Sequence, residues 1–298
     1  MNLVKQPFLT IGLPFYNNEN TLACAIQSVL MQTYTDWELI LINDGSTDHS
    51  NNIATAFAQL DKRIILINDS ENKGLVFRLN QIIDEAKGEY IARMDSDDMM
   101  MPDKLLKQMD VLISNTAIDV IDTAAYIINE KDEPTGTRGM DDLSKWDRRK
   151  TFKNVLLFHP TVVAKASWYR NNKYDQDFVR SEDFELWCRT FDSTVFARVY
   201  EPLFIYREGR VNIRNYVLSN RTYRKILRYH AKDVLSDTEI KTEIIKSHLK
   251  SLLYRFFSLF NMQHILSSKR NIRINVVQQN EVRVIIRKIK HFLHDTYS

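Results

Sequence analysis

The chain has 298 residues, 44% of them hydrophobic, which suffices for one large α/β domain or about two smaller ones with packed cores. Residues 1–200 hold 22 Lys and Arg against 30 Asp and Glu, whereas residues 201–298 hold 19 against 8, so the net charge changes from −8 to +11. The acidic first part argues against a general nucleic-acid binder, and the basic end suggests an anionic partner surface or a long anionic substrate.

Apolar runs alternate with amphipathic segments through the first 130 residues. This alternation predicts an α/β fold with a mostly parallel sheet, helices on both faces, and ligands at the carboxyl ends of the strands. The predicted strands are Phe8–Leu13, Trp37–Ile42, Ile64–Ile67, Tyr90–Met94 and Val120–Ile128. The predicted helices are Thr21–Met31, Asn51–Leu60, Leu75–Ala86 and Pro102–Ile113.

The loops after the first two strands carry groups that suit a nucleoside. Pro14-Phe15-Tyr16-Asn17, followed by Glu19, offers an aromatic ring, an amide and a carboxylate that can stack on a base and bond its edge. A simple strand-to-helix turn explains the same residues. Asp44 ends the second strand before Gly45 and is expected to face the crevice as an acceptor for a ribose hydroxyl or a base N–H.

The next two loops add basic and acidic groups. Lys73 and Gly74 follow the third strand and Arg78 lies one helical turn further, so both cations could face a phosphate near the helix N-terminus. Asp95-Ser96-Asp97-Asp98 follows the fourth strand. A divalent cation with a diphosphate would offset the repulsion between its first two carboxylates, and an acidic turn in water is the alternative.

The second half of the chain is less regular. Residues 130–150 are charged and contain proline and glycine, so a mobile loop is predicted there. Phe196–Tyr206 is predicted as a strand, and the pattern is helical and basic from about Asn212. The predicted organisation is a domain of residues 1–210, with halves 1–100 and 101–210, and a helical extension of residues 211–298.

The order of these motifs resembles that of the inverting glycosyltransferases of family 2, which have the GT-A fold. The resemblance covers about the first 210 residues and implies transfer of a sugar from a UDP-sugar to a hydroxyl, with Mn²⁺ or Mg²⁺ as cofactor. The matching motifs are Pro14-x-Tyr16-Asn17, Asp44-Gly45-Ser46-Thr47-Asp48, Asn72-x-Gly74 and Asp95-x-Asp97-Asp98.

The resemblance also implies roles for individual residues. Tyr16, Glu19 and Asp44 would surround uracil and ribose, and Asp95 and Asp97 would hold the cation on the diphosphate. Asp98 would brace the loop. The other residues expected at the donor are Pro14, Asn17, Lys73, Gly74, Arg78, Ser96 and Arg207.

Three further candidates lie after residue 150. An amphipathic helix with acids in its first turn explains Glu182 and Asp183 structurally, but the family's E-D-x-x-L-W-x-R motif implies that Asp183 is the catalytic base. His159 precedes a proline and is either a structural residue or a ligand of the metal, diphosphate or acceptor. Arg207 matches the family's closing Y-R element and could pair with a phosphate or with Glu182.

The segment Tyr90–Asp98 resembles the corresponding segment of family members that build O-antigen, capsule or related bacterial surface glycans. This resemblance implies a lipid-diphosphate-linked saccharide as acceptor. The sequence lacks the Q-x-x-R-W element of processive members, so one sugar per acceptor is expected. The alternatives are a sugar nucleotidyltransferase and a catalytically inactive glycan-binding or scaffold module.

The basic end carries two apolar stripes with flanking Lys and Arg. Such segments lie at anionic membrane interfaces, and packing on the domain or on another subunit, as in a homodimer, is the alternative. The charge favours the membrane, above all for the last helix. The stripes are Ile244, Ile245, Leu249, Leu252, Leu253, Phe256, Phe257 and Phe260, then Ile285, Ile286, Ile289, Phe292 and Leu293.

No signal peptide or membrane-spanning segment is predicted, because no uncharged apolar run approaches the roughly 20 residues that a spanning helix needs. Cys24 and Cys188 lack metal-type spacing and are expected to be reduced core residues. The expected location is the cytoplasm, peripheral at the inner membrane.

Overall fold

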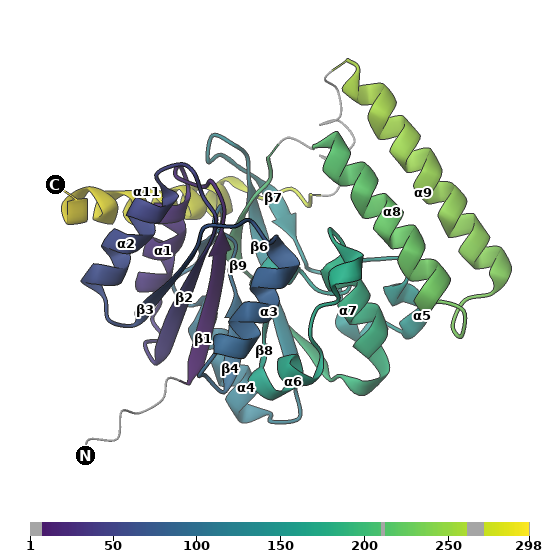
Figure 1. The fold of residues 1–298 in the computed structure, drawn as a ribbon, viewed down its shortest axis with the longest axis horizontal. Helices are drawn as coiled ribbons and strands as arrows, with labels where there is room; N and C mark the ends of the chain where they lie inside the picture. The colour runs from purple at the N-terminus through teal and green to yellow at the C-terminus, as the bar shows by residue number, and fades with distance from the viewer. Residues whose placement is uncertain (1–7, 210–211, 261–270, 298) are drawn as a thin grey trace.

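The computed structural model describes residues 8–209, 212–260 and 271–297 (Figure 1). Within these ranges nine strands form one sheet in the order β3-β2-β1-β4-β8-β6-β9-β5, and β7 pairs with β6. The strands are β1 (Leu9–Phe15), β2 (Trp37–Asp44), β3 (Ile64–Asp69), β4 (Tyr90–Arg93), β5 (Met99–Met100), β6 (Val120–Ile128), β7 (Pro134–Arg138), β8 (Val163–Lys165) and β9 (Phe196–Arg207).

The helices alternate with the strands in the first half of the chain and dominate its end. The α-helices are α1 (Leu22–Leu30), α2 (Ser50–Leu60), α3 (Leu75–Glu85), α4 (Lys104–Ser114), α5 (Arg148–Thr151), α6 (Ala166–Asn171), α7 (Glu182–Thr190), α8 (Ile213–His230), α9 (Asp237–Ser258) and α11 (Val276–Tyr297). The sequence predicted β6 without error, and the other predicted strands and helices agree to within about two residues. Short 3-10 helices include η2 (His159–Thr161) and η3 (Gln176–Phe178).

The direction of the strands divides the sheet. β3, β2, β1 and β4 are parallel to one another, as the alternating pattern predicted. β8 runs antiparallel between β4 and β6, β7 and β5 are also antiparallel to their partners, and β6 and β9 are parallel. The sheet is therefore mixed beyond β4. The carboxyl ends of the first four strands lie at one edge, and their loops meet there.

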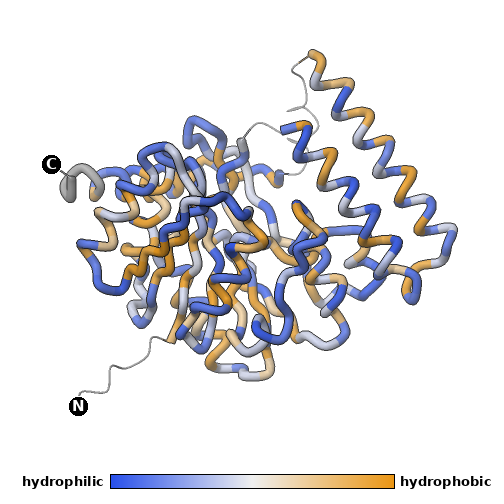
Figure 2. The backbone as a smooth tube through the Cα atoms, in the orientation of Figure 1, coloured by the Kyte–Doolittle hydropathy of each residue, from blue (hydrophilic) through white to orange (hydrophobic). Residues whose placement is uncertain are grey.

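Two layers of helices cover the sheet. On β2, Leu39 and Leu41 pack toward α1, α2 and α4, whereas Ile40 and Ile42 pack toward α3, α6 and α7. Successive side chains of a strand point to opposite faces, so one buried strand contributes to both cores. Figure 2 shows the resulting hydrophobic interior.

Residues 130–150 are more ordered than the sequence predicted. Pro134–Arg138 forms β7 and pairs with β6, and α5 begins at Arg148. The predicted mobile loop is wrong over β7, because the strand ladder with β6 satisfies its backbone. Cys188 is buried, as expected for a core residue, whereas Cys24 is only partly buried.

The three long helices at the end of the chain pack in two places. α8 packs on α7, and α9 pairs with α8, whereas α11 returns to contact α1 and the strands β5, β6 and β9. Val282, Ile286 and Ile289 of α11 are at most 4% exposed. The prediction that the last helix lies in a membrane is therefore wrong, because Ile286 and Ile289 of its apolar stripe are part of the core. Phe292 of the same stripe is 51% exposed, and the Leu293 side chain lies outside the described residues.

No helix in the described part of the chain has the length and apolar character that crossing a bilayer requires. The predicted domain boundary at residue 210 stays a prediction. The last helix, α11, packs on elements that precede this boundary.

Candidate active site

The loops after β1 and β2 hold each other in place. Asn17, in the left-handed region with φ 52°, accepts a hydrogen bond from the Thr47 backbone N–H at 2.8 Å. The Glu19 carboxylate accepts one from the His49 N–H at 3.0 Å. Asn17 and Glu19 thus brace the neighbouring loop, and the Tyr16 ring, 46% exposed, is the group of this segment that is open to a ligand. Pro14 is buried in β1.

Asp44 lies in a buried ion-pair cluster at the carboxyl end of β2. Its carboxylate accepts hydrogen bonds from the Lys73 and Gly74 backbone N–H groups at 2.8 and 3.0 Å, and from Arg78 Nε at 2.7 Å. Arg78 also pairs with Asp69 and is fully buried. The prediction that Arg78 faces a phosphate needs correction, because its guanidinium neutralises two aspartates inside the protein.

Lys73 and Gly74 keep positions that suit a donor phosphate. Both line the cleft described below, and Gly74 directly precedes α3 with φ 84°. Their backbone N–H groups already donate to Asp44, so the Lys73 ammonium is the group of this pair that a phosphate could contact. The Lys73 ammonium pairs with Asp69 at 2.7 Å and stays partly exposed.

The three aspartates after β4 form one cluster. Asp95, Asp97 and Asp98 each have a carboxylate oxygen within 4.8 Å of the others. Burial and then the charge of Asp95 raise the pKa of Asp97 to about 6, and burial also raises the pKa of Asp98. A divalent cation would relieve this crowding of charge, so half-buried Asp95 and Asp97 fit a metal at the edge of the cleft, which Asp95 lines and Asp97 does not.

Asp98 and Ser96 are turned inward. One oxygen of the buried Asp98 accepts a hydrogen bond from the Arg207 backbone N–H at 2.8 Å, and the other has no partner among the described residues. Ser96 donates to Asn18 at 2.8 Å. Asn18 was not among the predicted site residues, yet it ties the loop after β1 to the aspartate cluster.

Arg207 supports the loop that carries Asp95, Asp97 and Asp98. Its Nε donates to the Asp97 backbone oxygen at 3.0 Å, and its guanidinium pairs with Asp132, which also pairs with Lys290 of α11. Pairing with Glu182, one of the two predicted roles, is not what the structure shows. The last helix thus connects through Asp132 and Arg207 to the loop that carries Asp97.

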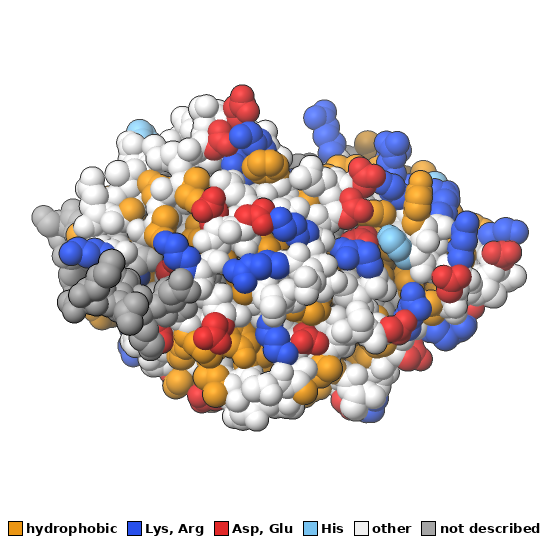
Figure 3. All heavy atoms as spheres, turned by 60° about the horizontal axis from the view of Figure 1, so that its bottom comes forward, with side chains coloured by type: hydrophobic (Ala, Val, Ile, Leu, Met, Phe, Trp, Pro, Cys, Tyr) orange, Lys and Arg blue, Asp and Glu red, His pale blue; other side chains and the backbone are white. Residues whose placement is uncertain are grey.

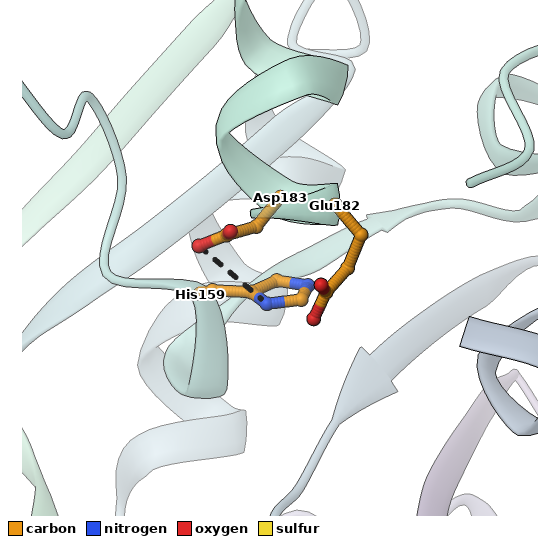
Figure 4. A group of neighbouring side chains, drawn as sticks. All are labelled: His159, Glu182 and Asp183. Atoms are coloured by element: carbon orange, nitrogen blue, oxygen red, sulfur yellow. Dashed lines mark ion pairs between the residues drawn. The ribbon is translucent and has the colours of Figure 1, made fainter. Parts of the chain in front are cut away.

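A second cluster faces the first from η2 and α7. His159, Glu182 and Asp183 lie together in Figure 4, with His159 Nδ1 3.8 Å from Asp183 Oδ2. His159 Nε2 is hydrogen-bonded to the Tyr174 hydroxyl at 2.8 Å. The sequence grouped His159 with Asp95 and Asp97 as a metal ligand, and the geometry groups its ring with Glu182 and Asp183 instead.

The protonation of this second cluster depends on burial. Burial, and then the charge of Asp183, raise the pKa of Glu182 to about 7, and burial also raises the pKa of Asp183. Burial and then Arg93 lower the pKa of His159 well below its usual range, so the ring is neutral near pH 7. A carboxylate with a raised pKa beside a neutral imidazole is suited to accept a proton.

Arg93 lies between the two clusters, and it was not among the predicted site residues. Its guanidinium pairs with Asp95 at 2.8 Å and is 7% exposed. Burial alone would lower the pKa of Arg93, but Asp95, Tyr174, Glu182 and Asp183 more than offset this and raise it. Arg93 therefore remains charged and neutralises part of both acidic clusters. An arginine within an otherwise apolar predicted strand, two residues before Asp95, was the available signal.

One cleft joins the two clusters. It has a volume of about 610 Å³ and is lined by both Asp95 and Asp183. Arg180, exposed at its rim, has a left-handed φ of 70° and turns the chain into α7. The remaining polar and charged lining residues are Lys73, Arg93, His159, Gln176, Glu182, Tyr206 and Ser219.

The sequence is similar to proteins of one family. Residues 10–178 match the profile of glycosyl transferase family 2. EpsE of Bacillus subtilis, named as a glycosyltransferase, is 36% identical over 191 residues, which is 62% of this chain and 67% of EpsE.

Solved structures share the GT-A fold. TarS of S. aureus in complex with UDP superposes with a TM-score of 0.58 at 15% identity, covering 84% of this chain and 72% of TarS. The mannosyltransferase PcManGT of Pyrobaculum calidifontis, in complex with GDP-Man and Mn²⁺, gives 0.59 at 13% identity, covering 83% and 70%.

Proposed function

The chain belongs to glycosyltransferase family 2, and we propose that it moves one sugar from a UDP-sugar to a hydroxyl of a lipid-diphosphate-linked saccharide, without processivity and with inversion. The observation that carries this proposal is the single cleft lined by both Asp95 and Asp183. It offers carboxylates for a cation and diphosphate on one side, and a carboxylate for an acceptor hydroxyl on the other. The structural relatives that hold UDP, or GDP-Man with Mn²⁺, support a nucleotide-sugar donor.

In the proposed reaction the acceptor oxygen attacks the anomeric carbon as the bond from that carbon to the UDP phosphate oxygen breaks. The hydroxyl proton passes to the Asp183 carboxylate, and UDP leaves with the bonding electron pair, so the configuration inverts. Burial raises the pKa of Asp183, which makes its carboxylate a stronger base. Asp95 and Asp97 would hold Mn²⁺ or Mg²⁺, which as a Lewis acid stabilises charge on the leaving diphosphate.

Neighbouring groups prepare the two carboxylate sites for this reaction. The neutral His159 packs beside Asp183 and does not compete as a charged partner. Arg93 reduces the repulsion between the two acidic clusters. The exposed Tyr16 ring is available to stack on the base, while Asp44 and Glu19 shape the loops around it.

The proposed setting is the cytoplasmic face of a bacterial inner membrane, in the synthesis of a surface glycan. Residues 1–210 would carry catalysis, and the helices α8 and α9 would place the enzyme near its lipid-linked acceptor. The high positive charge of residues 201–298 supports this setting.

The test is UDP release by the purified full chain from a panel of UDP-sugars with lipid-diphosphate acceptors, with Mn²⁺ and with EDTA. Acceptor-dependent UDP release that EDTA abolishes is expected, and NMR of the product should show a β-linkage. Asp97→Asn should lose most of the activity because it removes charge that holds the cation, whereas Asp110→Asn, an exposed acid on α4, should not. Full activity in EDTA, or in Asp97→Asn, contradicts the metal site.

The same experiment separates the alternative functions. A sugar nucleotidyltransferase would release pyrophosphate from a nucleoside triphosphate and a sugar phosphate. An inactive glycan-binding module would bind saccharide and release no UDP with any donor.

A further inference from the structure

The helix α9 is apolar on the face that no other described element covers. Ile240, Ser247, Ser251 and Tyr254 form its buried face, and the Tyr254 ring stacks on Tyr216 of α8 with centroids 3.8 Å apart. The opposite face carries six large apolar side chains that are between 50% and 61% exposed. We call these the outer row: Ile245, Leu249, Leu252, Leu253, Phe256 and Phe260. Figure 2 shows hydrophobic residues recurring along this helix.

The outer row differs from an ordinary solvated helix face. The buried face of α9 combines Ser247 and Ser251 with Ile240 and Tyr254. Its outer face carries large hydrocarbon side chains where a surface helix usually carries polar ones. Contiguous exposed apolar surface in a soluble protein marks a site of interaction. Ile244 and Phe257, which the sequence placed in the same stripe, are partly buried and do not belong to this surface.

The segments around the outer row are positively charged, and most of their cations have no acidic partner among the described residues. Residues 214–228 and 246–260 together carry eight Lys and Arg and no Asp or Glu. Lys250 lies on one side of the row and Arg255 on the other. The cations of these segments that have no acidic partner among the described residues are Arg214, Arg221, Arg224, Arg228, Lys250 and Arg255.

The acids of the α8–α9 pair are confined to the connecting turn and the first two turns of α9. Asp233, Asp237, Glu239 and Glu243 lie within eleven residues, and Glu239 pairs with Arg149 and Lys153 of the neighbouring segment. Figure 3, which brings the lower side of Figure 1 forward, shows acidic and basic side chains mixed at this end. The far end of the pair, where α8 begins and α9 ends, is basic only.

A hollow at this basic end combines the two kinds of group. It has a volume of about 320 Å³ and lies between the start of α8 and the end of α9. Three arginines and three aliphatic side chains line it, so it can take an anionic group that is joined to hydrocarbon: Arg214, Arg221, Arg255, Ile213, Val217 and Leu218.

The basic end lies on the same side of the molecule as the active cleft. In Figure 1, β1 runs upward from the N-terminal side, and α8 begins and α9 ends at the upper side of the molecule. Ser219 of α8 lines the cleft, one residue from Leu218 in the hollow. A flat anionic surface that contacts the hollow would therefore lie close to the acceptor side of the cleft.

We propose that the outer row of α9 and the basic hollow dock this protein on the surface of an anionic phospholipid bilayer. The outer row would enter the interface, and the arginines and Lys250 would contact lipid phosphates. The proposal rests on the proposed function for its purpose, since a lipid-linked acceptor must be reached at a bilayer. The binding itself requires neither donor nor acceptor.

The test is flotation of the full chain with vesicles of phosphatidylcholine alone and with phosphatidylglycerol added, without nucleotide sugar. The wild type should float with the anionic vesicles at low salt, much less at high salt, and little with phosphatidylcholine alone. Leu252→Ser with Phe256→Ser should abolish flotation, and Arg221→Gln with Arg255→Gln should weaken partitioning by roughly tenfold or more.

Matched controls are available on the same chain. Leu60→Ser removes an equally exposed leucine from α2, and Lys241→Gln removes a cation from the turn end of α9; both should float like the wild type. All substituted side chains are exposed, so thermal unfolding should be unchanged.

Three results would overturn the proposal. The first is that the wild type does not float, and the second is that the outer-row variant floats as well as the wild type. The third is that light scattering shows a dimer of the wild type and a monomer of the outer-row variant, while the other variants stay dimeric. The last would assign the row to a second copy of the chain. Loss of UDP release with normal flotation would instead count against the proposed reaction alone.

Discussion

The two walls of the cleft differ in how they treat charge. We call the loops after β1, β2 and β3 the donor wall; its aspartates Asp44 and Asp69 lie behind the cleft lining and are neutralised by Arg78. In the acceptor wall, formed by His159, Glu182 and Asp183, an oxygen of Glu182 has no partner among the described residues and both carboxyl pKa values are raised. The donor wall is built for rigidity, and the acceptor wall keeps its charge available for proton transfer.

The largest effect is expected at Asp183. Asp183→Asn should lower kcat by about 10²–10⁴-fold, the usual contribution of a positioned base, because the amide cannot take up the acceptor proton. Affinity for UDP, measured by calorimetry, should stay unchanged. Asp177→Asn, an exposed acid in η3, is the control and should keep full activity. Loss of UDP binding together with activity would place Asp183 in the donor wall.

The next effect concerns the stability of the donor wall. Arg78→Met leaves Asp44 and Asp69 without their shared cation, and removal of one partner from a buried ion pair costs about 3 kcal/mol or more of the free energy of unfolding. Arg63→Met breaks a partly exposed pair with Asp61 and should cost about 1 kcal/mol or less. Denaturant unfolding measures both. Equal losses of stability in the two variants would mean that the buried ion pairs of Arg78 stabilise the protein no more than a partly exposed pair does.

Substitution of Glu182 is expected to raise the free energy of unfolding, whereas substitution of Arg78 lowers it. The pKa of Glu182 is about 7 in the folded protein against an ordinary 4.5, so the folded state binds this proton more tightly and the wild type loses stability as the pH rises through that window. Glu182→Gln removes this cost and should stabilise the protein by about 1–2 kcal/mol above pH 7, with little change below pH 4.5. Unfolding curves across the range test this. A destabilised variant at high pH would show that the charge is compensated.

The smallest effect is expected at Asn17. Asn17→Ala loses the bond to Thr47 and replaces asparagine, which tolerates the left-handed region, by a residue that does so less well, so a loss of about 1–2 kcal/mol is expected. Asn17→Gly loses only the bond and should cost less, with weaker UDP binding in both. Both variants lose the side-chain bond, so a less stable glycine variant would contradict the argument from the left-handed backbone conformation.

Much of the fold follows from local pattern. The run Val120–Ile128 is β6 as predicted, and the loops that carry Tyr16, Asp44, Gly74 and Asp95 all follow strands of the parallel part. Periodicity and punctuation suffice there because each element is specified by its own residues. The predicted loop over residues 134–138 failed because a short polar strand forms only when a partner such as β6 supplies the ladder.

The roles of single charges did not follow from local pattern. Arg78 was predicted to face a phosphate because it lies one turn beyond Gly74, but Asp44 and Asp69 reach it from other strands. Arg93 was missed because its second cluster, Glu182 and Asp183, is some ninety residues away in sequence. Pairings of this kind depend on which strand ends meet.

The two basic helices α9 and α11 show most clearly that a local sequence pattern does not reveal which residues will pack together. Sequence alone determined that each is helical, basic and apolar along one stripe, because the 3.6-residue period and the charges are local properties. Tertiary structure decided that Ile286 and Ile289 are covered by strands of the sheet while Leu252 and Phe256 stay open to solvent. The physical reason is that an apolar face lowers the free energy against any apolar partner, and only long-range packing determines which partner reaches it.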